Sequence, residues 1–111
     1  MVNAKEELLA VLSRHGLDTR AIRAADIILD PYSYGPVLLE RPVVLKLPLD
    51  DTGIVRNLDV LDVEYDDDFG TQYLDGTVWL TDGAWLQRGE YDGSEWWEYC
   101  RYPVIPVDLI L

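Results

Sequence analysis

The chain has very little of several residue types that build chemical sites. Its 111 residues include one cysteine and one histidine, too few for an internal disulfide or a familiar zinc site. Only nine residues are basic against 21 acidic ones, and a formal net charge of −12 argues against direct nucleic-acid binding. No apolar run reaches the roughly 18 residues of a membrane span, and residues 1–7 lack a signal-peptide pattern. A single domain over residues 1–111, in a reducing cytoplasm, is expected.

The negative charge is concentrated in one part of the chain. Residues 57–98 contain 12 acidic residues and one basic residue, Arg88, whereas residues 1–56 contain eight acidic and seven basic ones. Carboxylates at alternate positions of a strand share a face at roughly 6.6 Å spacing and can imitate a row of phosphates. A solvated acidic face is the alternative interpretation. The candidate acidic surface comprises Asp59, Asp62, Glu64, Asp66, Asp67, Asp68, Asp75, Glu90 and Glu95.

The first thirty residues predict a helical hairpin. Asn3 is placed to cap a helix over residues 4–15, and Gly16 is placed to end it in a left-handed conformation. Asp18 is placed to cap a second helix, which the Asp-Pro step at positions 30 and 31 would end. The apolar positions of this second helix would be Ala21, Ile22, Ala25 and Ile28 or Leu29.

The remaining residues predict an antiparallel sheet of four or five strands. Val37–Leu47, interrupted by Pro42, is expected at an edge, and Leu58–Tyr65 alternates like a strand with a bulge near Leu61. Two Asp-Gly pairs, at positions 82–83 and 92–93, are typical of two-residue hairpin turns. They predict a three-stranded meander over residues 77–81, 84–91 and 94–102. The expected fold class is therefore α+β, with the helical hairpin packed on one face of the sheet.

These turns also predict which side chains share a face of the meander. The face expected to pack on the helices carries Val78, Leu80, Trp85, Trp96, Cys100 and Tyr102. The opposite face has the tryptophan, tyrosine and arginine content of a protein interface, and its candidate binding residues are Trp79, Trp97, Tyr99 and Arg88. It also carries Leu86, Glu90, Glu95 and Arg101. Coverage of this face by residues 37–47 or by the apolar tail Pro103–Leu111, expected to lie along the body, is the alternative.

No constellation of residues predicts catalysis. His15 stands at a helix end, where a capping role is expected, and Cys100 is expected to be an inert buried thiol. Asp66 and Asp68 lack the further oxygen ligands that a calcium loop needs, and the glycines stand singly rather than in a phosphate-binding loop. We therefore expect a protein that is not an enzyme, with no catalytic residue, metal or cofactor.

The last third of the chain resembles a group of small uncharacterised proteins of phages and bacterial mobile elements. The resemblance covers residues 77–99 and 103–106, with a Trp-Leu strand, an Asp-Gly turn, the block Tyr-Asp-Gly-Ser-Glu-Trp-Trp-Glu-Tyr and a closing Pro-x-Ile-Pro. In size and acidity the chain also resembles anti-CRISPR proteins, several of which imitate nucleic acids. This second resemblance is one of type, without a shared motif.

Two functions follow as expectations. The resemblance implies a phage-type inhibitor of a host nucleic-acid-binding defence complex, such as a CRISPR effector, acting stoichiometrically through the acidic surface in the cytoplasm of the bacterial host. The alternative is a protein-interaction or assembly module, such as a phage accessory protein or a homodimer, that uses the aromatic sheet face. Both exclude nucleic acid and membrane as direct partners.

Overall fold

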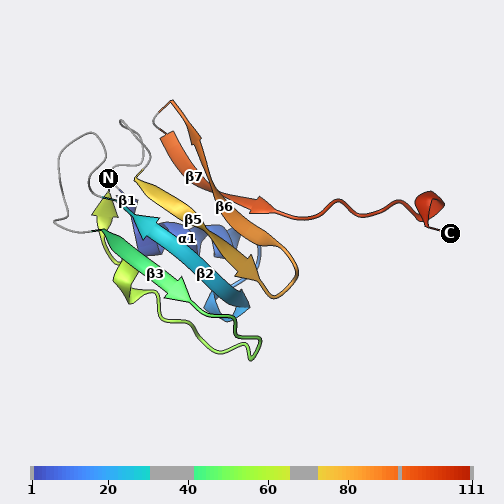
Figure 1. The fold of residues 1–111 in the computed structure, drawn as a ribbon, viewed down its shortest axis with the longest axis horizontal. Coiled ribbons are helices and arrows are strands. Elements are labelled where there is room, and N and C mark those ends of the chain that lie inside the picture. The colour runs from blue at the N-terminus through green and yellow to red at the C-terminus, as the bar shows by residue number, and fades with distance from the viewer. Residues whose placement is uncertain (1, 31–41, 66–72, 93, 111) are drawn as a thin grey trace.

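The fold is α+β, with one helix on one side of a five-stranded antiparallel sheet (Figure 1). The computed structural model describes residues 2–30, 42–65, 73–92 and 94–110. The expected class is therefore confirmed. The helix and strands are β1 (Val2–Asn3), α1 (Ala4–Arg14), β2 (Ile22–Leu29), β3 (Val43–Leu47), β4 (Glu64–Tyr65), β5 (Leu74–Leu80), β6 (Trp85–Tyr91) and β7 (Ser94–Cys100).

The five-stranded sheet has the strand order β3-β2-β5-β6-β7, with every neighbouring pair antiparallel. β3 lies at one edge, as expected, and only β5-β6-β7 forms a continuous meander. Figure 1 shows α1 behind the sheet, so the opposite face is turned toward the viewer. The core lies between these layers and includes Leu8, Val11 and Leu12 of α1 with Ile27, Leu29, Val78, Leu80, Leu86 and Trp97 of the sheet.

The N-terminal helix is confirmed to within one residue. The Asn3 side chain accepts a hydrogen bond from the Glu6 backbone N–H at 3.0 Å, so the expected cap is formed. At the other end Gly16 has φ +70°, the left-handed conformation that ends helices. Local sequence signals were sufficient here because both caps act within one turn of the helix.

The second predicted helix is wrong, because residues 22–29 form strand β2. Asp18 caps only a single 3-10 turn, Thr19–Ala21. The buried residues Ala25, Ile27 and Leu29 alternate, and a register shift between Ile22 and Ala24 places Ile22 on the same buried side. Because of this shift, the buried positions 22, 25 and 29 are three and four residues apart. That spacing is also typical of one face of a helix, which explains the wrong prediction.

The predicted strand Leu58–Tyr65 is also largely wrong. Residues Asp59–Leu61 form a 3-10 turn, and only Glu64–Tyr65 is a strand, β4, which pairs with β1 rather than with the main sheet. Leu58, Leu61 and Tyr65 are buried at spacings of three and four residues, so the segment packs beside α1 instead of alternating between two faces. The predicted acidic loop at residues 66–70 lies outside the described residues.

The two hairpins of the meander differ in how well the sequence predicted them. Between β6 and β7 the pairs Trp85↔Cys100 and Arg88↔Trp97 confirm the expected register. Between β5 and β6 the register is shifted by one residue, because Trp79 rather than Leu80 pairs with Trp85. The reason is a three-residue loop: Gly83, at φ +84°, donates its backbone N–H to the carbonyl of Leu80, whose own N–H bonds to Ala84.

This shift reverses the predicted faces of β6 and β7, because a one-residue slip turns each side chain to the other side of the sheet. Trp85, expected in the core, is only half-buried, and Trp96 is 39% exposed. Trp97, expected on the interface face, is buried at 5% exposed. The side chains on the α1 side of these strands include Leu86, Arg88, Glu95, Trp97 and Tyr99.

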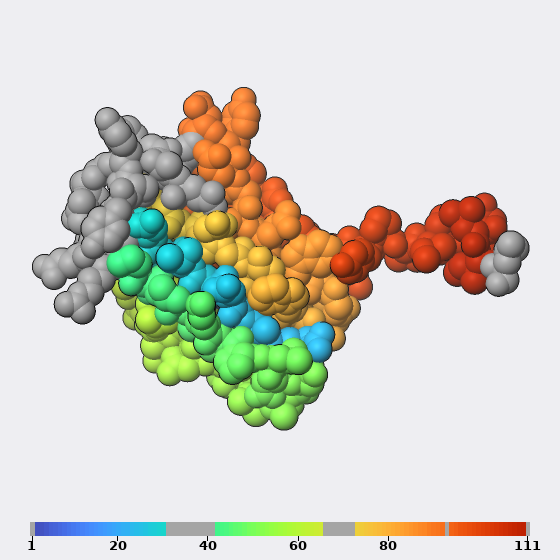
Figure 2. All heavy atoms as spheres, in the orientation of Figure 1, coloured from blue at the N-terminus to red at the C-terminus, as the bar shows by residue number. Residues whose placement is uncertain are grey.

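The C-terminal segment does not lie along the body. Residues 101–110 are all exposed, and Figures 1 and 2 show this segment, drawn in red, projecting away from the sheet. Its only regular element is a 3-10 turn at Val107–Leu109. We call residues 103–110 the tail. Among the described helices none is long and apolar enough to cross a membrane.

Candidate binding surfaces

Arg88, predicted on an exposed aromatic face, instead lies in the core. Its side chain is fully buried and forms an ion pair with Glu7 of α1 and another with Glu95 of β7, at 2.7 Å. It also donates to the Tyr65 hydroxyl at 2.9 Å, and its guanidinium carbon lies 5.0 Å from the centre of the Trp97 ring. Arg88 therefore ties α1 and β4 to the sheet and is not available to a partner.

Glu95 is likewise removed from the predicted acidic surface. Its fully buried carboxylate accepts hydrogen bonds from the backbone N–H groups of Tyr73, at 2.7 Å, and Leu74, at 2.9 Å, besides the bond from Arg88. Burial raises the pKa of Glu95 above its ordinary value, although these hydrogen bonds favour the carboxylate. Burial also raises the pKa of the Tyr65 hydroxyl. The sequence analysis did not predict this cluster. The signal for it was that Arg88 is the single basic residue among the 12 acidic residues of positions 57–98.

The sheet face turned away from α1 carries large apolar side chains. Trp79 is 45% exposed, and it is accompanied by Trp96, half-buried Trp85, Ile28 and Val44. In Figure 2 strands β3, β2, β5 and β6 lie at the front surface, and no described helix passes over them. We call this side of the sheet the open face. Its polar residues include Asp26, Lys46, Asp75, Gln87 and Glu98, so the tryptophans stand among hydrogen-bonding and charged groups.

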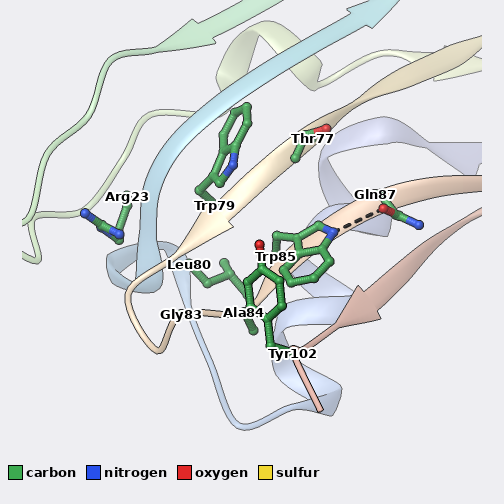
Figure 3. Close-up of a pocket in the computed structure, with 9 residues that line it drawn as sticks. All are labelled: Arg23, Thr77, Trp79, Leu80, Gly83, Ala84, Trp85, Gln87 and Tyr102. Carbon is green, nitrogen blue, oxygen red and sulfur yellow. Dashed lines mark hydrogen bonds between the residues drawn. The ribbon is translucent and has the colours of Figure 1, made fainter. Parts of the chain in front are cut away.

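A groove of about 250 Å³ lies on the open face where the tail begins. Nine residues line it; Trp79, Trp85 and Tyr102 supply its aromatic surface, and Arg23 is the only charged one (Figure 3). The Trp85 and Tyr102 rings lie 5.0 Å apart at a tilt of 54°, and the Trp85 indole N–H donates to the Gln87 side chain at 3.1 Å. No carboxylate is among the nine residues, but the Arg23 guanidinium is ion-paired with the exposed Asp51 carboxylate, so a negative group stands beside the groove.

Exposed carboxylates gather beside the start of α1. Asp62 accepts a hydrogen bond from the Asn3 side chain at 2.7 Å, and Asn3 also pairs with Glu64 across β1 and β4. Lys5 donates to Asp59 at 2.6 Å, a hydrogen bond that raises the lysine pKa. We call Glu6, Asp59, Asp62 and Glu64 the acidic edge; all four are exposed.

The other predicted acidic residues are not brought to this edge. Asp75 points outward from β5 on the open face, and Glu90 is exposed near the end of β6, opposite Glu95 in the register. Asp66, Asp67 and Asp68 lie outside the described residues. The predicted acidic surface is therefore divided, with three of its nine members at the acidic edge.

His15 and Cys100, the two residues considered for catalysis in the sequence, both contact neighbouring groups of the fold. His15, at the end of α1, stacks on Tyr99 with ring centres 3.9 Å apart, and the Tyr99 hydroxyl donates to Asp82 at 2.8 Å. Cys100 is half-buried on the open face rather than in the core, and partial burial raises the pKa of its thiol. Within residues 2–30, 42–65, 73–92 and 94–110, no group of three or more histidine, cysteine, aspartate or glutamate side chains is arranged to hold a metal ion.

Comparisons of this chain with protein-family models, with curated proteins and with solved structures found no match.

Proposed function

We propose that this protein is an interaction module whose partner protein docks on the open face of the sheet. The observation that carries the proposal is the exposure of Trp79 and Trp96, with half-buried Trp85, on a face that no described helix covers. Tryptophan is enriched in the residues that dominate binding energy at protein interfaces. The proposal keeps the interaction module expected from the sequence and changes its residues, since Trp97 and Arg88 are buried.

The open face also has the mixed chemistry of an interface. Large aromatic side chains supply area that is favourable to bury, at about 25 cal/mol per Å². Lys46, Gln87 and Glu98 stand around them and can form the polar rim that fixes orientation. A partner that covers both kinds of residue gains affinity from the aromatics and specificity from the rim.

The experiment begins with immobilised protein, host lysate and mass spectrometry, followed by affinity measurements on the partner it identifies. Trp79→Ala with Trp96→Ala should weaken binding by at least about tenfold without unfolding the domain, because both side chains are exposed. Binding through this face should change little between roughly 0.1 and 1 M salt. Wild-type affinity in the double tryptophan variant would contradict the proposal.

A second function is favoured by the acidic edge. Four exposed carboxylates stand there near one described base, Lys5, and the chain continues from β4 directly into Asp66, Asp67 and Asp68. The corresponding proposal is a phage-type inhibitor that presents this edge to a basic, nucleic-acid-binding complex of a bacterial host, in its cytoplasm. The resemblance of residues 77–99 and 103–106 to phage and mobile-element proteins supports this setting.

The two proposals make opposite statements about one variant. Neutralising the acidic edge with Asp59→Asn, Asp62→Asn and Glu64→Gln should abolish steep salt dependence and slow association if the inhibitor proposal holds. The same triple variant should bind like the wild type if the partner docks on the open face. Each set of substitutions is therefore the matched control for the other.

A further inference from the structure

Two polar side chains connect the tryptophans of β6 and β7 on the open face. The Trp85 indole N–H donates to Gln87 at 3.1 Å, as Figure 3 shows, and the Gln87 amide donates in turn to Oε2 of Glu98 at 3.4 Å. The Trp96 indole N–H donates to Oε1 of Glu98 at 3.2 Å. We call these four residues the Glu98 cluster. Its hydrogen bonds hold both indole rings beside one carboxylate.

Gly89 makes room for the Glu98 cluster. It pairs with Trp96 across β6 and β7, and an added Cβ would lie 2.7 Å from both the Trp96 ring and Oε1 of Glu98. The φ of Gly89 is not positive, so space rather than backbone conformation favours glycine here. The indole and the carboxylate therefore lie close against the β6 backbone. Trp96 nevertheless remains 39% exposed, so part of its ring is accessible to a partner.

The Glu98 carboxylate has no basic partner. Both groups that donate to it, Gln87 and Trp96, are neutral, and none of the ion pairs among the described residues includes it. Each carboxylate oxygen accepts one of these hydrogen bonds, so each retains a further acceptor site. Glu98 therefore presents a negative charge and two free acceptor sites to whatever covers the open face.

The bases around the sheet are engaged elsewhere or distant from this carboxylate. Arg23 and Arg88 both form ion pairs, the second of them on the α1 side. The Arg101 charge acts on the Tyr99 hydroxyl, which also belongs to the α1 side. Lys46 shares the open face, but it stands on β3, four strands from β7 along one cross-strand row. That distance is roughly 19 Å at the usual strand spacing, beyond the screening length of about 10 Å at 0.1 M salt.

A carboxylate beside tryptophan rings is complementary to arginine. The guanidinium group carries a permanent positive charge, stacks on tryptophan and offers a planar fork of N–H donors that matches a carboxylate. The net charge of −12 also attracts a basic partner toward the chain. Charge complementarity therefore favours a cationic side chain over a neutral or acidic one at this point of the open face.

We propose that the Glu98 cluster binds an arginine side chain of the partner protein, with the guanidinium stacked on Trp96 and hydrogen-bonded to Glu98. The arginine site rests on the docking surface proposed above and names the chemistry of the partner residue that meets it. Because the partner covers the ion pair, salt screens it less than it screens an exposed pair.

The test is an NMR titration of the isotope-labelled full chain with Nα-acetylarginine amide, up to about 50 mM at constant ionic strength. The four tryptophans supply four indole N–H signals, of which the buried Trp97 is the internal reference. The signals of Trp85 and Trp96 should shift progressively while that of Trp97 stays in place. Nα-acetylcitrulline amide has nearly the same shape without the charge and should shift them at least about threefold less.

Matched variants separate this site from general attraction to an acidic protein. Glu98→Gln keeps an oxygen that can accept from the Trp96 indole and removes only the charge, so the shifts should fall at least about threefold. Glu64→Gln at the exposed acidic edge makes the same change in net charge and should leave the shifts unchanged. Equal shifts with the arginine and citrulline amides, or wild-type shifts in Glu98→Gln, would overturn the arginine site.

Different variants test the docking surface and the arginine site on the captured partner. Glu98→Gln should weaken partner binding at least about tenfold, whereas Glu64→Gln should not. If the Trp79→Ala, Trp96→Ala variant loses affinity and Glu98→Gln does not, the open face stands as the docking surface and the arginine site alone fails. Wild-type affinity in both variants would contradict the docking surface and the arginine site together.

Discussion

Removal of the Arg88 guanidinium tests the most consequential contact of the core. Arg88→Met keeps a long apolar side chain but leaves the fully buried Glu95 carboxylate without its cationic partner. Breaking one side of a buried ion pair typically costs about 3–5 kcal/mol, because the remaining charge stays desolvated. Glu7 loses its partner too, but its side chain is 18% exposed and is expected to be rehydrated. We therefore expect a loss of about 3–5 kcal/mol in the free energy of unfolding.

Such a loss is large for a domain of this size. Small domains have about 5–15 kcal/mol of stability in total, and each kcal/mol corresponds to roughly 4 °C in Tm at this chain length. Arg88→Met should thus lower Tm by roughly 12–20 °C. Urea unfolding followed by tryptophan fluorescence measures the change directly. Arg101→Met, at an exposed position, is the control and should stay within about 0.5 kcal/mol.

A double-mutant cycle with Glu95→Gln separates the buried charge from lost packing. Glutamine retains an oxygen that can accept from the Tyr73 or Leu74 backbone N–H and carries no charge. The cost of Arg88→Met should therefore be smaller by about 1–3 kcal/mol in the Glu95→Gln background. Equal costs in both backgrounds, or a loss below about 1 kcal/mol in the single variant, would refute the reasoning.

Three further predictions test the core, the sheet and the first hairpin by urea unfolding. Trp97→Ala should lower the free energy of unfolding by about 3–5 kcal/mol, and Trp96→Ala by less than about 1 kcal/mol. The reverse order would support the faces that the sequence predicted. Gly76→Ala should cost at least about 1–3 kcal/mol, since φ is +146° and a Cβ would lie 2.3 Å from the carbonyl oxygen of Asp26; a change within about 0.5 kcal/mol would contradict that close approach. Partial burial opposes ionisation of Asp82, but hydrogen bonds from the Ala84 N–H and the Tyr99 hydroxyl outweigh it and lower its pKa below 3.8. The ionised Asp82 carboxylate therefore stabilises the fold above about pH 4, and this stabilisation is lost as pH falls through the pKa of Asp82 in the folded state. Asp82→Asn should make the free energy of unfolding less dependent on pH in this acidic range.

Features set by a few adjacent residues could be predicted from the sequence. Helix α1 begins after Asn3 and ends before Gly16, because both caps depend on atoms within one helical turn. The β6–β7 register follows from the turn at Asp92, whose φ of 52° suits a tight hairpin. Exposure of the acidic residues at Asp59, Asp62 and Glu64 was also predictable, since carboxylates rarely leave water without a partner.

The open face and the buried ion pairs required the tertiary structure. The loop at Gly83 has three residues where the sequence predicted two, and this single residue turns Trp85 and Trp96 outward and Trp97 inward. Only then do Arg88 and Glu95 face α1, where Arg88 forms ion pairs both with Glu95 and with the distant residue Glu7.

By itself the sequence determined the fold class, the helix with its caps, the second hairpin and the concentration of negative charge. The tertiary structure decided that residues 22–29 form strand β2, held between β3 and β5, and which side of β6 and β7 faces the core. It also decided that the tail stands clear of the body. The physical reason is the range of the interactions: caps and tight turns are formed by neighbours in sequence, whereas strand pairing and burial depend on partners tens of residues away.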